Sequence, residues 1–243
     1  MIVHVHALCW NEEEMLPFFF RHYDRVADRY FIYDDGSTDR SRELLAHNSR
    51  VTLRRFETAG DSFVAAARRH YDECWKSSRG AADWVIVCNI DEHCCHPELR
   101  TYLARCQEHG ISVIVPEGYE MYAETLPSAG AALCRAVQRG CRARYMDKPE
   151  IFNPTDIEEI NFSLGRHRAR PTGRVCVLGD SDVKLLHFKY VGFEYTLARY
   201  SALAKRRRRG DVEEGCGGQY AWSRDRLRSE FEYLRSHSVK VPQ

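Results

Sequence analysis

The stretch DWVIVCNIDEHCCHP, residues 83–97, carries side chains suited to two different metal chemistries. Thiolates and imidazoles are typical zinc ligands, and residues 93–96 read His-Cys-Cys-His. Carboxylates prefer harder cations such as Mg²⁺ and Mn²⁺, and Asp91 and Glu92 stand directly before that run. The stretch therefore raises two alternatives: a zinc site, or a carboxylate site for a hard cation that carries a nucleotide.

The Cys-His run at residues 93–96 does not by itself predict a closed zinc site. Adjacent residues on a strand or turn point in different directions, so four neighbours do not easily complete a tetrahedron. The ten cysteines of the chain are scattered and include no C-x-x-C pair, which is typical of free thiols in a reducing compartment. We therefore expect free cysteines and no structural zinc within this run.

Two other acid-rich segments stand in the same relation to an apolar run. Residues 11–14, NEEE, follow the β-rich run at 2–8, and residues 34–39, DDGSTD, follow the run at 29–33. Ligands of parallel α/β sheets bind at the carboxyl ends of the strands. Three polar strand ends at one edge therefore indicate a ligand site, whereas a single DDGS would be an ordinary turn.

The elements that position these strand ends alternate between strand and helix. Strands are expected at residues 2–8, 29–33, 50–56, 83–90 and 111–116, and helices at 11–27, 40–48, 61–77 and 97–110. The expected helix caps are Asn11, Ser37 or Thr38, and Asp61 or Ser62. The alternation predicts a mainly parallel sheet with helices on both faces. It fades after about residue 118 into short β-like runs, and two helical segments follow Gly192.

In combination, the segments NEEEMLP, FFFRHY, YFIYDDGSTDRS and ADWVIVCNIDEH resemble the GT-A, family 2-like glycosyltransferases, in particular a compact bacterial subgroup with N-E-E, D-x-G-S-T-D and D-x-D-E-like motifs. The later segments KPEIFNP, GRHRARP and LLHFKY also look like that subgroup, so the resemblance covers about residues 1–200. It implies a Rossmann-like α/β domain at residues 1–190 with a small β-rich insertion, divided into a donor half at 1–118 and an acceptor half at 119–190. Residues 191–243 are expected to form a helical extension packed on the same domain.

The resemblance also implies an activity. Such enzymes transfer a sugar from a nucleotide-diphosphate donor with inversion, usually with a divalent cation, so we expect Mn²⁺ or Mg²⁺ and, by default, UDP. A hard cation neutralises the charge of the departing nucleoside diphosphate as a Lewis acid. The expected acceptor is a glycan, a lipid-linked molecule or a small molecule, in bacterial surface polysaccharide or glycoconjugate synthesis.

The resemblance assigns roles to individual residues. Asp91 matches the second acid of the family's D-x-D motif and is the expected cation ligand, with His187 and Glu92 as further candidates. The residues expected at the nucleotide sugar are Asn11, Glu13, Asp34, Asp35, Asp61, Arg69, Asn89, Ile90 and Asp91, with Arg68 as the alternative to Arg69. Simple strand packing for His187, turn formation for the paired acids and helix capping for Asp61 remain open as alternatives.

The sequence departs from the family pattern at two positions of the opening stretch. Asn89 stands where the first acid of D-x-D is usual, and an amide can bond a ribose hydroxyl but is a poorer metal ligand. His93 stands where an aromatic residue is usual, and either His93 or His96 could face the donor pocket. We therefore expect Asp91, with help from Glu92 or His187, to hold the cation.

An inverting transfer needs a general base near the acceptor hydroxyl. The family usually places an acid beyond the fifth strand, where this chain has VPEGYEMYAET. We expect Glu120, and next Glu117, to serve as the base, since both are expected in the loop after that strand. Glu124, Asp147 and Asp156 are weaker candidates, and each acid could instead be an ordinary surface residue.

Overall charge and hydropathy exclude few classes of function. The formal net charge is +1, from 36 basic and 35 acidic residues, and no run approaches the ~20 apolar residues of a membrane span. The first residues, MIVHVHALCWNEEE, do not resemble a signal peptide, so we expect a cytoplasmic protein. The basic run at 205–209 is either a solvated helix end or a peripheral contact with the inner face of a membrane. Without interleaved aromatic residues it does not predict nucleic-acid binding.

Two other functions are compatible with acidic strand ends. A nucleotidyltransferase would also hold a cation there, but it is expected to have a Gly-rich N-terminal loop followed by a basic residue, which HALCWNEEE lacks. A catalytically inactive protein that binds a glycan or a nucleotide is the second alternative, and the departure at Asn89 keeps it open.

Overall fold

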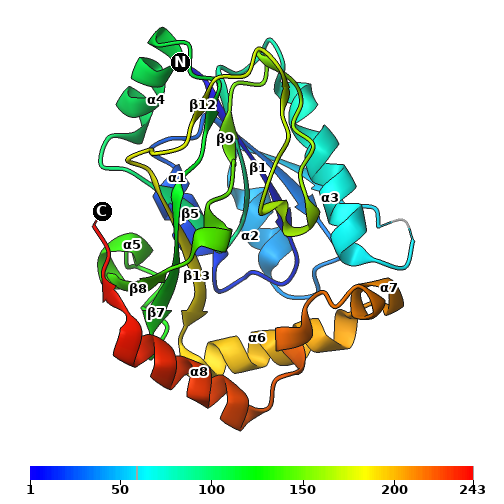
Figure 1. Ribbon diagram of the computed structural model, residues 1–243. Helices are drawn as coiled ribbons and strands as arrows, with labels where there is room; N and C mark the ends of the chain where they lie inside the picture. Colours follow the sequence, from blue (N-terminus) through cyan, green and yellow to red (C-terminus); the bar gives the residue numbers. More distant parts are fainter. Residues whose placement is uncertain (59, 243) are drawn as a thin grey trace.

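Within residues 1–58 and 60–242, the part of the chain described by the computed structural model, a seven-stranded sheet forms the centre of the molecule (Figure 1). Its strand order is β12-β6-β9-β4-β1-β2-β3. These strands are β1 (Val3–Cys9), β2 (Arg29–Asp34), β3 (Val51–Arg55), β4 (Trp84–Asn89), β6 (Val113–Ile114), β9 (Ile151–Phe152) and β12 (Val177–Leu178). Strand β9 alone runs antiparallel to its described neighbours, so the expectation of a mainly parallel sheet is confirmed.

Helices cover both faces of this sheet, as the alternation predicts. They are α1 (Leu16–Tyr23), α2 (Ser41–His47), α3 (Phe63–Glu73) with the 3₁₀ turn η1 (Cys74–Ser78), and α4 (Leu99–Glu108). Side chains of α1, α2 and α4 share one buried core with Val3, Val5 and Ala7 of β1. Helix α3 and η1 share a second core with the opposite face of the sheet. On that face His4 Nδ1 and His6 Nε2 each lie 2.9 Å from Ser78 Oγ.

Helix starts differ from expectation at two places. Helix α1 begins at Leu16, so the expected cap at Asn11 is wrong: Asn11 has a φ of 50° and belongs to a loop that bonds residues 37–39. Helix α2 follows Arg40 rather than Ser37 or Thr38. Ser62 does cap α3, because its side chain accepts a hydrogen bond from the Ala65 amide at 3.0 Å.

A second sheet, with the strand order β14-β8-β7-β13-β5, lies beside the first. Its strands are β5 (Glu92–Cys95), β7 (Glu117–Ala123), β8 (Arg139–Arg142), β13 (Lys184–Val191) and β14 (Val239–Lys240). Residues 117–123 are therefore a strand rather than the expected loop, because they pair with residues far along the chain in β8 and β13. Strand β5 starts three residues after β4 ends, so the turn at residues 90–91 connects the two sheets.

The remaining short elements connect these sheets. They are α5 (Leu133–Ala136), β10 (Ile157–Glu159), β11 (Thr172–Gly173), and the 3₁₀ turns η2 (Arg144–Met146), η3 (Leu164–Arg166) and η4 (Gly218–Ala221). Strands β10 and β11 form a small antiparallel pair.

Three helices follow the last long strand: α6 (Phe193–Arg206), α7 (Arg209–Glu213) and α8 (Arg224–His237). Figure 1 shows α6 and α8 side by side below the second sheet, and α7 lies against the first residues of α3. Helices α6 and α8 pack on the second sheet through a buried aromatic and aliphatic cluster, which includes Tyr122, Tyr190, Phe193, Leu227 and Phe231.

The domain boundaries at residues 118 and 190 stay predictions. Among the described residues, no helix combines the length and apolar character needed to cross a membrane.

Asp211 fastens α7 to the start of α3. Its carboxylate accepts hydrogen bonds from the Phe63 amide at 3.1 Å, the Val64 amide at 3.0 Å and the Ser62 hydroxyl at 2.8 Å. It also accepts one from the Arg208 amide at 3.2 Å, so one side chain caps two helices. Burial alone would raise the pKa of Asp211, but these hydrogen bonds lower it below its ordinary value.

We expect Asp211→Ala to lower the free energy of unfolding by about 1–2 kcal/mol at pH 7, the usual value of a helix cap. Urea denaturation measures this, with Glu213→Ala on the same helix as the control, since its ion pair is exposed. Because the folded pKa of Asp211 is depressed, its contribution is present above the ordinary value of 3.8 and is lost as the pH falls through the lower folded value. Equal stability of both variants at pH 7 would contradict the capping role.

Candidate active site

The three polar strand ends lie at one edge of the main sheet. In the register of the parallel strands, Cys9 of β1 is opposite Asp34 of β2, and Leu8 is opposite Asn89 of β4. The segments that follow these strands therefore leave the sheet side by side, which is the position where α/β sheets bind ligands.

A pocket of about 540 Å³ opens at the ends of β2 and β3. It is lined by Asp34, Asp35, Gly36, Arg42, Leu53, Arg54, Arg55 and Phe56. Asp34 accepts a hydrogen bond from the Ser37 amide at 3.1 Å. Asp35 accepts one from Thr58 Oγ1 at 3.2 Å and pairs with Arg206 at 2.9 Å. Both acids predicted for the nucleotide thus lie in a pocket that also offers an aromatic ring and guanidinium groups.

Asn11 and Glu13 join two loops at this edge. The Asn11 side-chain oxygen accepts a hydrogen bond from the Thr38 amide at 2.7 Å, and Glu13 accepts one from the Arg40 amide at 3.1 Å. Both side chains therefore shape the pocket wall by holding the loop after β2 against the loop after β1.

Three other predicted nucleotide contacts lie outside this pocket. Asp61 is exposed before α3, where its carbonyl accepts a hydrogen bond from the Gly210 amide at 2.9 Å. Arg69 is exposed on α3, and Arg68 pairs with Asp72 on the same helix. The Ile90 side chain is 1 % exposed within the core, so only its backbone could reach a ligand.

Asp91, His187, Glu120 and Tyr145 form a chain of contacts between the two sheets. His187 Nε2 lies 3.3 Å from the Asp91 carboxylate, and His187 Nδ1 lies 3.1 Å from the Glu120 carboxylate. The Tyr145 hydroxyl donates to Glu120 at 2.5 Å. Of the two carboxylates, Asp91 is the more accessible, with 30 % of its side chain exposed against 6 % for Glu120.

The charges around His187 stabilise its protonated form. Burial alone would lower the pKa of His187, but the Glu120 and Asp91 carboxylates raise it to about 10. In turn His187 outweighs the effect of burial on Asp91 and lowers the pKa of that carboxyl. When no metal ion is bound, the positive charge of protonated His187 partly compensates the negative charges of Asp91 and Glu120.

Asp91 and His187 together fit a divalent cation. Two neighbouring ligands of a six-coordinate Mg²⁺ ion lie about 3 Å apart, close to the 3.3 Å between His187 Nε2 and Asp91 Oδ2. Glu120 contacts the other ring nitrogen, and such a contact fixes the tautomer that presents Nε2 to a metal. Since Nδ1 can donate to Glu120, the neutral ring keeps its free lone pair on the Asp91 side.

Glu92 does not fit the predicted role of metal ligand. It is fully buried, and its carboxylate forms ion pairs with Lys148 and, at 2.6 Å, with Arg166. Burial opposes ionisation of Glu92, but Lys148 and Arg166 outweigh it and hold its pKa well below the ordinary value. The neighbouring Glu150, which also bonds Arg166 at 2.8 Å, has a raised pKa because of burial and the charge of Glu92. Both Glu92 oxygens are therefore committed to internal cations.

Asn89 is committed to the same buried network. Its side-chain oxygen accepts a hydrogen bond from the Tyr71 hydroxyl at 2.9 Å, and its amide nitrogen donates to Glu92 at 3.2 Å. The backbone amide of Asn89 also donates to Glu92 at 2.8 Å. The departure from the D-x-D pattern thus places a neutral side chain where a second carboxylate would face Glu92 at hydrogen-bonding distance.

The two predicted general bases point to opposite faces of β7, as residues 117 and 120 of a strand must. Glu120 is bonded to His187 and Tyr145 and is 5 % exposed. Glu117 pairs with Lys184 at 2.5 Å and with Arg142 at 2.9 Å, beside a separate pocket that Asp147 also lines. The structure therefore brings Glu120, but not Glu117, to Asp91 and His187.

Sequence reasoning missed the residues that α6 contributes. Arg199 donates to the carbonyls of Trp10 and Asn11, both at 2.8 Å, and forms an ion pair with Glu12. Burial raises the pKa of Glu12 to about 8, although Arg199 opposes the shift. Arg206 lies 4.1 Å from the centre of the Trp10 ring. A cation on an amphipathic helix is unremarkable in sequence, so no local signal could have paired Arg199 with residues near position 11.

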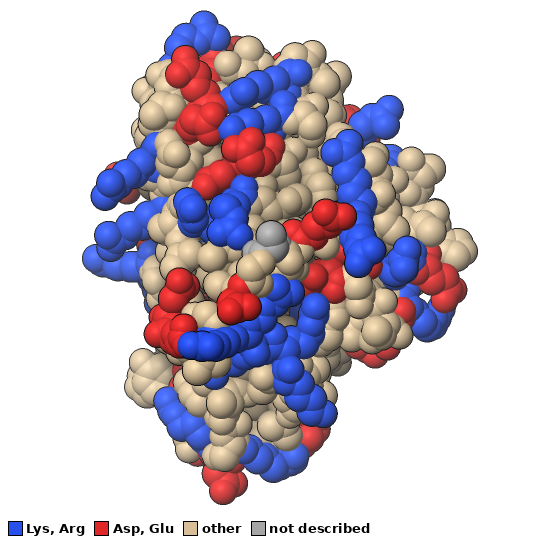
Figure 2. Space-filling model, turned by 90° about the vertical axis from the view of Figure 1, so that its right-hand side faces the viewer, with Lys and Arg blue, Asp and Glu red and all other residues tan. Residues whose placement is uncertain are grey.

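The basic run at residues 205–209 is largely engaged by the protein itself. Arg206 pairs with Asp35 and Arg209 with Glu213, while Arg207 and Arg208 donate to the carbonyls of Cys216 and Gly60. Figure 2 views the side of the molecule that carries α3 and α7, where basic and acidic side chains are interspersed. A membrane contact through this run stays a prediction.

His93 and His96 do not line the pocket at the strand ends. His93 is fully buried and its ring stacks on His22, with the centroids 4.6 Å apart. His96 lies beyond β5, against Tyr102. All ten cysteines are free, as expected.

No protein-family model matches the chain, and no curated protein matches its sequence. Two solved structures of S. aureus TarS are similar in fold. One has a TM-score of 0.50 and 14% identity, and covers 97% of this chain and 43% of that chain. The other, TarS 1-349 in complex with UDP, has a TM-score of 0.50 and 13% identity, and covers 84% of this chain and 65% of that chain.

A third structure, glucosyl-3-phosphoglycerate synthase from Mycobacterium tuberculosis with Mn²⁺, UDP and phosphoglyceric acid, covers 49% of this chain and 43% of that chain at 17% identity. Its TM-score is 0.33. The chain spans less than two thirds of the TarS chains that it matches. At such low identity the similarity shows the fold alone, which is the mixed α/β fold of the GT-A type.

We expect Glu92→Gln to lower the free energy of unfolding by about 3–5 kcal/mol, because it leaves Lys148 without its buried carboxylate and Arg166 with Glu150 as its remaining buried partner. Chemical denaturation measures the loss, and Glu108→Gln, at the exposed end of α4, is the control. If Glu92→Gln instead kept full stability and weakened Mn²⁺ binding, Glu92 would be a metal ligand after all.

Proposed function

We propose that the chain is a glycosyltransferase that takes a sugar from a nucleotide-diphosphate donor, with UDP as the expected nucleotide. The observation that carries this proposal is the pairing of Asp91 with His187 at the same sheet edge as the pocket around Asp34 and Asp35. The GT-A type fold supports it. Its acceptor would be a glycan, a lipid-linked molecule or a small molecule of bacterial surface glycoconjugate synthesis, on the cytoplasmic side.

The pocket at the ends of β2 and β3 suits a nucleoside. Asp34 and Asp35 offer carboxylate oxygens that accept hydrogen bonds from sugar hydroxyls or from a base N–H. Phe56 and Leu53 supply apolar contacts, and Arg54 and Arg55 add positive charge at its wall. The arrangement recognises a neutral polar group by direct hydrogen bonds while its basic residues attract a phosphorylated ligand.

Asp91 and His187 would hold a Mg²⁺ or Mn²⁺ ion. When bound, the cation would supply Lewis-acid stabilisation to the departing diphosphate. Asp91 provides the carboxylate, and His187 provides Nε2 once its proton has left. Arg199 holds the loop of Trp10 and Asn11 close to Asp91, and it adds a fixed positive charge beside the site.

Glu120 suits a positioning role better than that of general base. It is nearly inaccessible, and it already contacts His187 Nδ1 and the Tyr145 hydroxyl. A base must lie within hydrogen-bond reach of the acceptor hydroxyl. We therefore assign Glu120 the orientation of His187, and the pairing of Glu117 with Lys184 and Arg142 gives that residue a structural role.

The decisive measurement is a thermal-shift and calorimetric screen of UDP, GDP, CDP and dTDP with and without Mn²⁺, followed by hydrolysis of the matching nucleotide sugar. We expect Asp91→Asn and His187→Gln each to reduce turnover at least about 100-fold, or about 3 kcal/mol. His96→Gln, on the loop after β5, is the matched control and should keep full activity.

Failure of the wild-type protein to bind any of the four nucleotides with Mn²⁺ present would overturn the proposal. Tight binding without turnover of any nucleotide sugar would identify an inactive nucleotide-binding protein instead.

Asp34 and Asp91 are expected to act on different parts of the donor. We expect Asp34→Asn to weaken binding of uridine and of UDP equally, by about 10- to 100-fold, since it loses charged hydrogen bonds to the nucleoside. Asp91→Asn should weaken UDP alone, and only when Mn²⁺ is present. Isothermal titration with both ligands separates the two effects, and equal losses from both variants for uridine would contradict this division of roles.

A further inference from the structure

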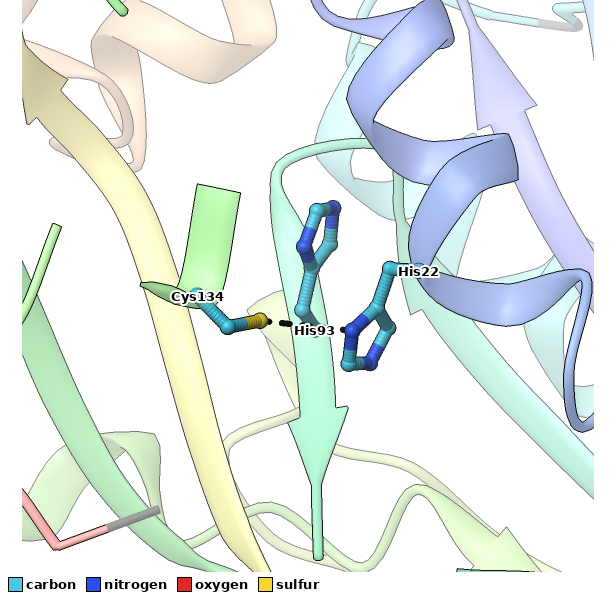
Figure 3. A group of neighbouring side chains, drawn as sticks. All are labelled: His22, His93 and Cys134. Atoms are coloured by element: carbon cyan, nitrogen blue, oxygen red, sulfur yellow. Dashed lines mark hydrogen bonds between the residues drawn. The ribbon is translucent and has the colours of Figure 1, made fainter. Parts of the chain in front are cut away.

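Three side chains with metal-binding atoms meet beside β5, away from Asp91 and His187. They are His22 near the end of α1, His93 on β5 and Cys134 on α5. One potential ligand atom of each lies within 4.8 Å of the other two. Figure 3 shows His22 and Cys134 reaching toward each other from either side of the strand that carries His93, and His22 Nδ1 lies 3.3 Å from Cys134 Sγ.

His93 is a buried polar residue whose ring nitrogens form no well-aligned hydrogen bond with the described residues. The residue is fully buried and neither Nδ1 nor Nε2 has a partner of normal geometry, although the Ile90 backbone lies close enough to counteract part of the burial effect that lowers the pKa of His93. Leaving such a buried group unsatisfied is unfavourable, because it loses its hydrogen bonds to water without replacing them. The aromatic rings around it, Phe19, Tyr23 and Phe188, could equally surround the aromatic residue expected at this position. Packing alone therefore does not explain an imidazole here.

His22 is already oriented as a metal ligand. Its Nε2 lies 2.9 Å from the Cys94 carbonyl oxygen, which can only accept, so Nε2 carries the proton. In the neutral ring the lone pair is then on Nδ1, the nitrogen that faces Cys134. A backbone carbonyl that fixes the tautomer in this way is a common partner of metal-bound histidine.

Cys95 supplies a fourth donor. Alternate residues of a strand project from the same face, so Cys95 lies on the side of β5 that carries His93. Interaction with the Cys134 thiol lowers the pKa of Cys95, so the two thiols lie near each other. Two of the four residues in the His-Cys-Cys-His run thus combine with two residues from other elements. Four adjacent residues would not easily complete a tetrahedron, but ligands from three elements can.

We propose that His22, His93, Cys95 and Cys134 bind a structural Zn²⁺ ion. Two imidazoles and two thiolates are a common donor set of tetrahedral zinc sites. Neighbouring ligand atoms of such a site lie about 3.4–3.8 Å apart, so the atoms of His22, His93 and Cys134, now within 4.8 Å of one another, need shifts of about 1 Å. The His93 ring, which now stacks on His22 at an interplanar angle of 11°, must turn toward the thiols.

The consequence is a link between three elements next to the candidate active site. Zinc would join the end of α1, the strand β5 and the short helix α5. Strand β5 begins directly after Asp91, so the ion would hold the strand that presents that carboxylate. The site uses none of the residues assigned to nucleotide or cation binding, so it stands or fails independently of the proposed glycosyl transfer.

The test uses the full chain, purified under reducing conditions and freed of metal with a chelator. We expect one equivalent of Co²⁺ to produce the d–d bands of tetrahedral cobalt and a thiolate charge-transfer band, and Zn²⁺ to abolish both. Elemental analysis of the untreated protein should give about one zinc per chain. Added Zn²⁺ should raise the melting temperature, since a ligand that binds the folded state stabilises it.

Variants then locate the ion. Cys134→Ser and His93→Phe should weaken Zn²⁺ binding at least about 100-fold in competition with a chromophoric chelator, and Phe restores the aromatic expected at position 93. Cys176→Ser and His96→Phe are controls with the same changes of side chain type outside the cluster, and they should bind as the wild type does.

Any of four results would overturn the proposal. The wild-type protein could take up no zinc, it could bind cobalt without a thiolate band, or all variants could bind zinc equally. Mass spectrometry under non-reducing conditions would identify a Cys95–Cys134 disulfide, which would also exclude the metal. The wild-type cobalt spectrum decides the question even if a variant fails to fold.

Discussion

The carboxylate of Glu92 holds together the part of the molecule on which the candidate site depends. It lies fully buried at the start of β5 and binds Lys148, Arg166 and the backbone and side chain of Asn89. A buried carboxylate is tolerated only with such partners, and its loss leaves cations uncompensated. Through these contacts the segment around residues 144–166 is fixed beneath the turn between β4 and β5. The turn in turn presents Asp91 at the edge of the sheet.

This network also explains the departure from a two-acid motif. A carboxylate at position 89 would face Glu92 at the distance where the Asn89 amide now donates a hydrogen bond. The amide donates a hydrogen bond to Glu92, and the proposed metal ligands are instead Asp91 and His187 of β13 in the second sheet. In that proposal, the ligand absent from the turn is supplied by a strand almost a hundred residues away.

The helices after β13 complete the site rather than merely cover the second sheet. Arg199 fixes the loop after β1, Arg206 reaches Asp35 and Trp10, and Asp211 caps α3. Two sets of potential metal ligands lie near β5, one at the turn that precedes it and one on the strand itself. The carboxylate and imidazole of Asp91 and His187 suit a hard cation, while His93 and Cys95 meet His22 and Cys134 in a softer donor set.

The sequence by itself determined the alternating elements, the mainly parallel sheet, the cap at Ser62 and the meeting of three polar strand ends at one edge. These features follow from short-range periodicity, capping and the rule that parallel strands end together. Tertiary structure alone decided that Glu92 and Asn89 turn inward, that residues 117–123 pair as a strand, and that His22 and Cys134 join His93. Each of those outcomes depends on burial against partners that are dozens to more than a hundred residues away, and local pattern contains no information about which distant segment will supply them.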